Sequence, residues 1–278
     1  LYFASSSPNA AVLYEYFFDE ASLSNTASDV TKHVVDYVPR EIIRIATEPV
    51  SGTVFALSSG ESNAVFVYKT FWDGSDKVMS AWSKWTLGET ENEAFIHGFA
   101  VLSGYLVVVV ERPDGVFLEQ IQIEREAIDV NLGFIPMIDQ RVILTGSYNS
   151  GTNLTTFTFP YEHDDDAVIM LGGDFDEPGR ELNLSFPSAT TATVIGDFSA
   201  GDVYAGRPYS SVVELSKIYF REAQSGVPVV DARIQLKQLI LTYERTGYFR
   251  VRITPEQRDP FEFEFTGRII GEGSNQIG

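Results

Sequence analysis

Short segments in which apolar and polar residues alternate dominate this chain, and they constrain its fold more than any other feature. Aromatic and β-branched residues recur with a period of two, and Gly, Pro, Asn and Asp separate the segments. This pattern is typical of β-strands, whereas a helix needs apolar residues three or four positions apart. We predict an all-β fold, with a helix only in brief pieces such as residues 19–25. The clearest predicted strands are residues 65–68, 105–110, 157–159, 234–243, 248–253 and 261–265.

The N-terminal part contains an internal repeat. Residues 2–19 are echoed by residues 54–73, so that Tyr14 corresponds to Tyr68, and a looser third copy spans residues 105–123. Each copy reads as a strand, a polar turn and a second strand. The spacing leaves room for two more strands between the second and third copies, which we expect at residues 77–87 and 95–102.

A period in the low fifties with about four strands is the spacing of a β-propeller blade. One four-stranded sheet cannot bury both of its faces alone, whereas stacked sheets can. Large aromatic side chains would fill the space between the sheets: Phe66, Tyr68, Trp72, Trp82 and Trp85. The alternative is a β-sandwich whose hairpins resemble one another. We predict incomplete propeller-like blades over residues 1–126, and because such blades do not close a ring, we expect the chain to be a segment of a longer protein.

The pattern changes after residue 126. Residues 127–206 are rich in Thr, Ser, Gly and Asp, and from Arg207 onwards basic and apolar residues alternate in longer strands, as in residues 233–239. Such alternation is typical of an antiparallel sheet with one face in water. We therefore predict an antiparallel β-sandwich-like region over residues 127–278. Its shorter strands are expected at residues 141–145, 155–159, 167–171 and 191–194.

The charge of the chain is strongly acidic and unevenly distributed. Among 278 residues, 39 acidic residues oppose 20 basic ones, which gives a formal net charge of −19. This balance argues against tight binding to nucleic acid and against docking on an anionic membrane surface. Residues 207–278, by contrast, hold nine acidic and ten basic residues, which suggests a second surface with a different role. Solubility alone is the simpler explanation of the acidic excess.

No motif in the sequence identifies an enzyme. The chain has no cysteine, and its three histidines, His33, His97 and His163, stand far apart without metal-ligand spacing. The densest acidic stretches, residues 164–166 and 174–177, could supply oxygen ligands for Ca²⁺, but their spacing matches no calcium loop, and a solvated loop explains them better. We expect no catalytic residues, no cofactor and no metal site.

Four stretches, in order along the chain, carry a resemblance to a known family. They are residues 19–39, 67–85, 226–236 and 246–271, and the Ser-Ala-Trp-Ser-Lys-Trp sequence at residues 80–85 is the most specific part. Residues 127–206 match only loosely. On these residues the chain resembles the tail tubular protein B, or nozzle protein, family of short-tailed bacteriophages.

This resemblance implies a structural component of the virion tail that is assembled in the host cytoplasm. The family is hexameric and forms a tapered tube through which the genome leaves, with a tail adaptor ring and tail fibres as partners. DNA would pass without specific binding, and the region after residue 126 would be the nozzle. Family members are longer at both ends, and no catalytic residues carry over to this chain.

The charge has a candidate use in such a tube. We expect acidic residues to line the bore and repel passing DNA, and we expect the near-neutral region from Arg207 to be a subunit or adaptor interface. The alternative function is a glycan-binding or glycan-degrading module at the host surface. A glycosidase would need two carboxylates about 5–9 Å apart in an aromatic-lined cleft.

Overall fold

The computed structural model describes residues 1–6, 11–19, 23–39, 41–74, 76–123, 136–163, 166–214, 220–221, 228–229, 237–242, 249–255 and 258–265. It divides into two compact units, Leu1–Tyr209 and Ser210–Gly278. The regular elements in these ranges are β-strands, and their pairings are antiparallel. The predicted all-β class is therefore confirmed. Within the same ranges, no helix has the length and apolar character that crossing a membrane requires.

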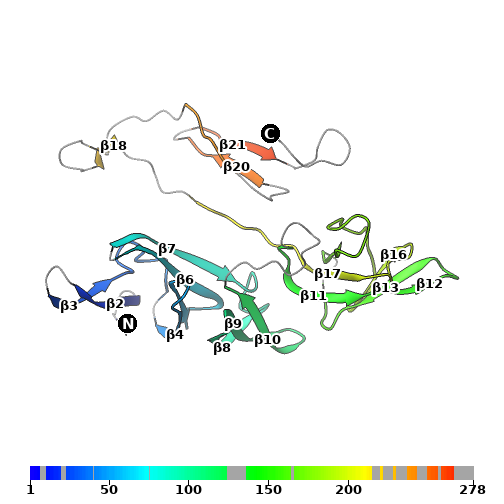
Figure 1. The fold of residues 1–278 in the computed structure, drawn as a ribbon, viewed down its shortest axis with the longest axis horizontal. Helices are drawn as coiled ribbons and strands as arrows, with labels where there is room; N and C mark the ends of the chain where they lie inside the picture. Colours follow the sequence, from blue (N-terminus) through cyan, green and yellow to red (C-terminus); the bar gives the residue numbers. More distant parts are fainter. Residues whose placement is uncertain are drawn as a thin grey trace. The chain divides into compact units, whose positions relative to one another are not determined.

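Three consecutive sheets form the N-terminal part of the first unit (Figure 1). In each sheet the strands are hydrogen-bonded in chain order, as in a β-meander. The two clearest copies of the sequence repeat lie on equivalent hairpins, with Tyr14 in the second strand of one and Tyr68 in the second strand of the other. The first sheet contains β1 (Tyr2–Ser6), β2 (Ala11–Asp19) and β3 (Ser24–Asp29); the second contains β4 (Ile42–Glu48), β5 (Thr53–Ser58), β6 (Glu61–Asp73) and β7 (Asp76–Thr86); the third contains β8 (Phe95–Leu102), β9 (Tyr105–Arg112) and β10 (Gly115–Gln122).

The second sheet is buried on both faces because it lies between the first and the third. Phe55 and Val67 share a buried cluster with Val108 of the third sheet. On the opposite face, Tyr68 shares a cluster with Leu13 of the first sheet. Full burial of a side chain of this size contributes about 1.5–3 kcal/mol. Apolar stacking therefore holds the three sheets together.

Four of the five aromatic residues predicted to lie between the sheets do so. Phe66 and Tyr68 are fully buried, and Trp82 and Trp85 are half-buried against the same clusters. The prediction is wrong for Trp72, whose exposed fraction is 39%. Its strand, β6, is long, and the last part of the strand extends beyond the stacked region.

The prediction of a short helix at residues 19–25 is wrong for the part of that segment that the structure describes. Asp19 ends β2 and Ser24 begins β3, and these two residues are paired across a hairpin. Asp, Ser and Asn favour turns as readily as helix starts, and the pairing of the flanking strands decides between the two. Residues 20–22 lie outside the described residues.

Two further sheets complete the first unit and share one core. The buried side chains of Phe157 and Ala192 come from one sheet, and those of Ile169 and Val203 come from the other. Two antiparallel sheets that face a common core form a β-sandwich. The predicted boundary between residues 126 and 127 lies outside the described residues. One sheet pairs β11 (Asp139–Thr145), β17 (Asp202–Arg207) and β14 (Val168–Leu171), and the other pairs β12 (Ser147–Asn149), β13 (Leu154–Thr158), β16 (Thr191–Ile195) and β15 (Ser185–Ser188).

The second unit contains two hairpins in its described residues. β18 (Phe220–Arg221) pairs with β19 (Pro228–Val229), and β20 (Phe249–Ile253) pairs with β21 (Phe261–Phe265). The strand predicted at residues 234–243 is wrong for residues 237–242, which form no strand, and its remaining positions are not among the described residues. Alternation of residue types does not supply the partner that a strand needs for its backbone hydrogen bonds.

Because the stacking of the sheets holds the first unit together, truncating a side chain at a sheet interface should weaken the whole unit. We expect Phe66→Ala to lower the free energy of unfolding by about 3–5 kcal/mol, since it leaves a cavity between the first and second sheets. Val50→Ala is the control, because Val50 is 95% exposed, and it should change stability by less than about 0.5 kcal/mol. Chemical denaturation followed by circular dichroism measures both, and equal effects of the two variants would contradict the stacking.

Candidate functional site

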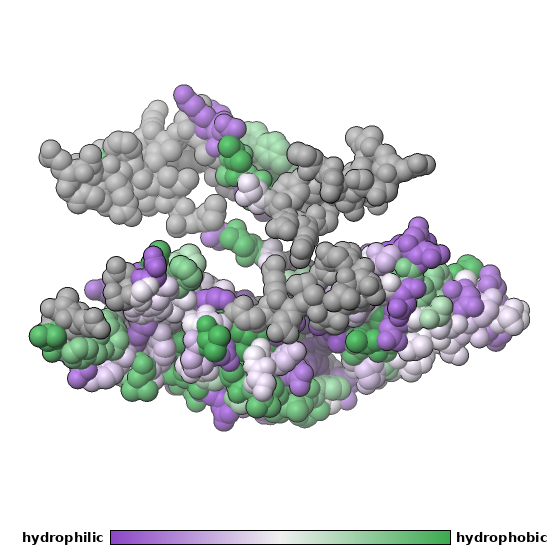
Figure 2. Space-filling view, in the orientation of Figure 1, coloured by the Kyte–Doolittle hydropathy of each residue, from purple (hydrophilic) through white to green (hydrophobic). Residues whose placement is uncertain are grey.

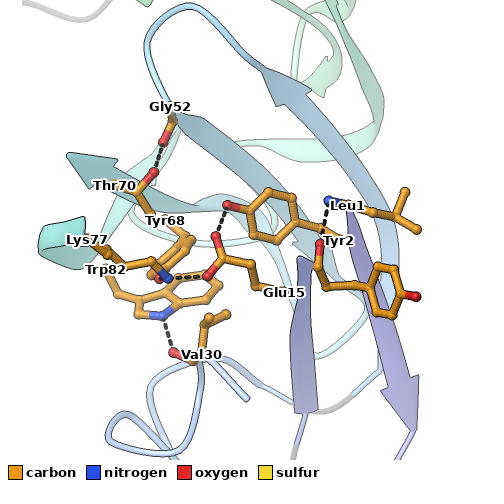
Figure 3. Close-up of polar contacts among 10 residues, drawn as sticks. Leu1, Tyr2, Glu15, Val30, Gly52, Tyr68, Thr70, Lys77 and Trp82 are labelled. Carbon is orange, nitrogen blue, oxygen red and sulfur yellow. Dashed lines mark hydrogen bonds and ion pairs between the residues drawn. The ribbon is translucent and has the colours of Figure 1, made fainter. Parts of the chain in front are cut away.

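A polar cluster lies between the first and second sheets, at the interface that the stacking depends on (Figure 3). Glu15 of β2 is only 4% exposed, and its carboxylate has two donors. The hydroxyl of Tyr2 donates to Oε1 at 2.6 Å, and Nζ of Lys77 donates to Oε2. The same Nζ donates to the hydroxyl of Tyr68 at 3.3 Å. The cluster thus joins strands β1 and β2 of the first sheet to β6 and β7 of the second.

The surroundings of this cluster shift the pKa values of two of its members. Burial raises the pKa of Tyr2, and the adjacent carboxylate of Glu15 raises it further. For Lys77, burial acts to lower the pKa, but the hydrogen bond to Glu15 and the neighbouring Tyr68 outweigh it, so the pKa is raised. The phenol is therefore held neutral and the ammonium charged. Removing one partner of such a buried pair leaves an uncompensated charge, which is strongly destabilising.

The local sequence explains why Lys77 reaches Glu15. The β6–β7 turn contains Gly74 at a φ of 62°, a left-handed conformation that favours glycine, and the turn brings β7 back along β6. Lys77 then lies opposite Trp72, with its Nζ 5.3 Å from the centre of the indole ring. An aromatic face at this distance attracts a cation. The exposed Trp72 therefore has a role at the cluster, although it does not fill the space between the sheets.

A second polar cluster lies on the third sheet, between side chains of β9 and β10. Arg112 donates two hydrogen bonds to the carboxylate of Glu119, at 2.6 and 3.0 Å, and a third to the carbonyl of Leu87. Burial raises the pKa of Asp139 on β11, against the opposing effects of the Gln140 amide and of Arg112. The positive charge of Arg112 on the third sheet therefore acts on Asp139 of the sandwich.

The sandwich carries a cavity of about 430 Å³ that contains both carboxylates and aromatic rings. Glu177 forms an ion pair with Arg180, and two hydrogen bonds from Ser199 lower the pKa of Asp197. The lowered pKa of Asp197 is the opposite of what the general acid of a glycosidase needs. Asp197 is therefore not suited to be that proton donor. Its lining residues are Leu171, Phe175, Asp176, Glu177, Arg180, Asp197 and Phe198.

The structure places the three histidines on separate elements. His33 is exposed in the loop after β3, and His97 on β8 lies 2.8 Å from Glu111 of β9. His163 is buried, with its ring between those of Phe159 and Phe186. In the described part of the chain, no three His, Asp or Glu side chains are grouped as they would be around a metal ion.

Of the two acidic stretches, residues 164 and 165 are outside the described residues. Asp166 is exposed, and Asp176 and Glu177 lie at the sandwich cavity. The strands after Arg207 that were predicted to alternate basic and apolar residues are described only in part. Arg250 and Arg252 lie 3.7 and 3.6 Å from Glu262 on the paired strand, so these two arginines face an acid of their own hairpin.

Sequence reasoning missed the Glu15 cluster, although a signal for it was present. Ala11, Leu13 and Glu15 occupy alternate positions of β2, and all three are buried. An acidic residue at an inward position of an alternating strand requires a buried partner. The identity of that partner, Lys77, depends on the stacking of two sheets, which alternation within one strand does not reveal.

Comparison of the sequence with known proteins identifies its family. The family model described as bacteriophage nozzle protein matches residues 1–278. The tail tubular protein gp12 of Escherichia phage T7 is 24% identical over 296 residues, an alignment that covers all of this chain. The chain spans 36% of the length of that relative.

The raised pKa values of Tyr2 and Lys77 predict a loss of stability at alkaline pH. A group whose pKa is raised by folding stabilises the protein below its unfolded pKa, here about 10, and this contribution is lost as the pH rises through the folded pKa. We expect Tyr2→Phe to cost about 1.5 kcal/mol at pH 7 and to reduce the loss of stability above pH 10. Urea denaturation between pH 7 and pH 11 measures this, with Tyr16→Phe, a half-exposed residue of β2, as the matched control. An unchanged pH dependence in Tyr2→Phe would contradict the cluster.

Proposed function

Because the chain belongs to the bacteriophage nozzle protein family, we propose that it is a structural part of a bacteriophage tail, located in the virion, and that copies of it surround the path by which the genome leaves. The proposal rests on family membership and on one physical observation, the separation of charge between the two units. The name of the T7 relative, a tail tubular protein, supports it.

Counted by formal charges, one unit is neutral and the other carries the whole net charge. Residues 210–278 hold nine acidic and nine basic residues, so the whole net charge of −19 belongs to residues 1–209. Like charges repel DNA phosphates over a screening length of about 8–10 Å at physiological salt. A wall with this charge keeps DNA from adhering while it passes. The near-neutral unit can approach another copy without that repulsion.

The finer description of the assembly belongs to the same proposal. Six copies form the tube, a tail adaptor ring and tail fibres are its partners, and assembly takes place in the host cytoplasm. DNA passes without specific binding. Residues 1–126 form propeller-like blades, and the sandwich and nozzle region begins at residue 127. The stacking of three consecutive sheets supports the first of these two assignments.

The proposed role is not enzymatic. At the sandwich cavity, the lowered pKa of Asp197 does not suit a general acid, and Glu177 is engaged in an ion pair with Arg180. The chain also lacks cysteine, so neither a thiol nucleophile nor a disulfide takes part in its function. The tube is held by apolar stacking and hydrogen bonds, without a cofactor or a metal.

The proposal predicts the mass and the DNA affinity of the purified chain. Light scattering should give six times the chain mass of 30.9 kDa, and a 30-base-pair duplex should show no mobility shift even at low salt, where electrostatic binding is strongest. Carbohydrate released from host polysaccharide should not rise above the buffer control. A single-chain mass combined with tight DNA binding or glycan release would contradict the proposal.

A further inference from the structure

The third sheet presents an apolar face that no described part of the chain covers. We call it the outer sheet face, and it comprises Phe95, Leu102, Tyr105, Val109, Val116 and Leu118, all of which are exposed. In the strand register, Val109 pairs with Leu118 and Tyr105 pairs with Leu102, so these side chains lie on one side of the sheet. Figure 2 shows apolar residues gathered at the lower edge of the first unit, where Figure 1 places β8 and β10.

Over residues 105–110 the central strand of this sheet is apolar on both sides, and Glu111 follows on the outer face, opposite Phe95 and Val116. Leu106, Val108 and Val110 face the second sheet and are fully buried, whereas Tyr105 and Val109 alternate with them on the outer face. A strand with one face in water alternates apolar and polar residues, and a strand that is apolar throughout is normally covered on both sides. The sequence of β9 is therefore that of a strand whose outer face is also covered.

The outer sheet face is hollowed at its centre. A cavity of about 360 Å³ opens where Gly98 contributes no side chain, and Val109 and Leu118 form part of its lining. The guanidinium of Arg44 borders it and donates a hydrogen bond to the carbonyl of Phe99 at 3.0 Å. A hollow with apolar walls and a cation at its rim suits an aromatic ring.

The second unit presents a complementary face. We call it the hairpin face, and it comprises Val251, Ile253, Phe261 and Phe263 of β20 and β21. Val251 pairs with Phe263 and Ile253 pairs with Phe261, so the four residues lie on one side of the hairpin. Phe263 is 60% exposed. Among the described strands β20 and β21 pair only with each other, and a two-stranded hairpin alone is at best marginally stable in water, so this face needs a partner.

We propose that the hairpin face of one copy docks on the outer sheet face of the next copy. This inference rests on the proposed function, because a ring of more than two copies needs a heterologous interface, in which two different patches of the same chain meet. The outer sheet face and the hairpin face are two different patches of this kind among the described residues. Charge favours this pairing, since the unit that contains the hairpin has no net charge, whereas contact between two acidic first units would bring like charges together. The exposed phenylalanine rings of the hairpin match the hollow beside Gly98.

Because this chain contains no cysteine, single introduced thiols report on this interface directly. The experiment co-expresses a Leu118→Cys chain with a Phe263→Cys chain and treats the product with a short thiol-reactive cross-linker. We expect a two-chain product from the co-expressed pair and none from either variant alone. Ile195→Cys is the matched control for Leu118→Cys, because Ile195 is an equally exposed apolar strand residue of the sandwich, and it should give no product with Phe263→Cys.

The mass of the same samples separates failure of the interface from failure of the proposed function. A six-chain assembly without the cross-link would overturn the interface and leave the function standing, and single chains without the cross-link would overturn both. A doubly substituted chain, diluted with an excess of unsubstituted chain, tests a different arrangement. If it cross-links only within itself, the hairpin covers its own sheet and the proposal is wrong.

A charge placed in the interface gives an independent test. We expect Leu118→Asp and Phe263→Asp each to reduce the six-chain assembly to single chains, with the strand signal in circular dichroism unchanged. Ile195→Asp should keep the assembly. If all three variants keep it, the two faces do not meet.

Discussion

The burial of the second sheet on both of its faces is the constraint on which the rest of the first unit depends. Along β6, Val65 and Val67 face the third sheet, while Phe66 and Tyr68 face the first. A sheet that is apolar on both sides is not stable alone, so it forms only when both neighbours are in place. The third sheet also has an exposed apolar face, on its outer side, and burial of that face would stabilise it in the same way.

Polar contacts give this stack a defined arrangement, because apolar packing alone is non-directional. Tyr2 donates to the buried carboxylate of Glu15 from the neighbouring strand of the same sheet, whereas Lys77 donates to it from the second sheet, so the contact with Lys77 ties the two sheets together. Net charge acts at longer range. In the proposed tube, the acidic first unit repels DNA and the neutral second unit approaches other copies.

The sequence predicts the strands well because alternation reflects a local property, the two faces of a strand. The prediction fails where the structure of a segment depends on the strand or sheet that packs against it. Residues 237–242 have a run of three apolar residues but form no strand. Asp19 and Ser24, which belong to a segment that resembles a helix start, pair across a hairpin. Glu15 was overlooked for the same reason, since its partner Lys77 is brought to it only by the stacking of two sheets. The sequence did indicate the family, the charge separation and the paired burial of Phe66 and Tyr68.

A density map of the assembled protein by electron cryomicroscopy tests the central claim most directly, because it locates the charges relative to the bore. The account predicts six chains around an axial hole that is lined by carboxylates of the acidic first unit, with the neutral second unit at the contacts between chains. A bore lined by lysine and arginine, with the acidic residues facing outward, would contradict it.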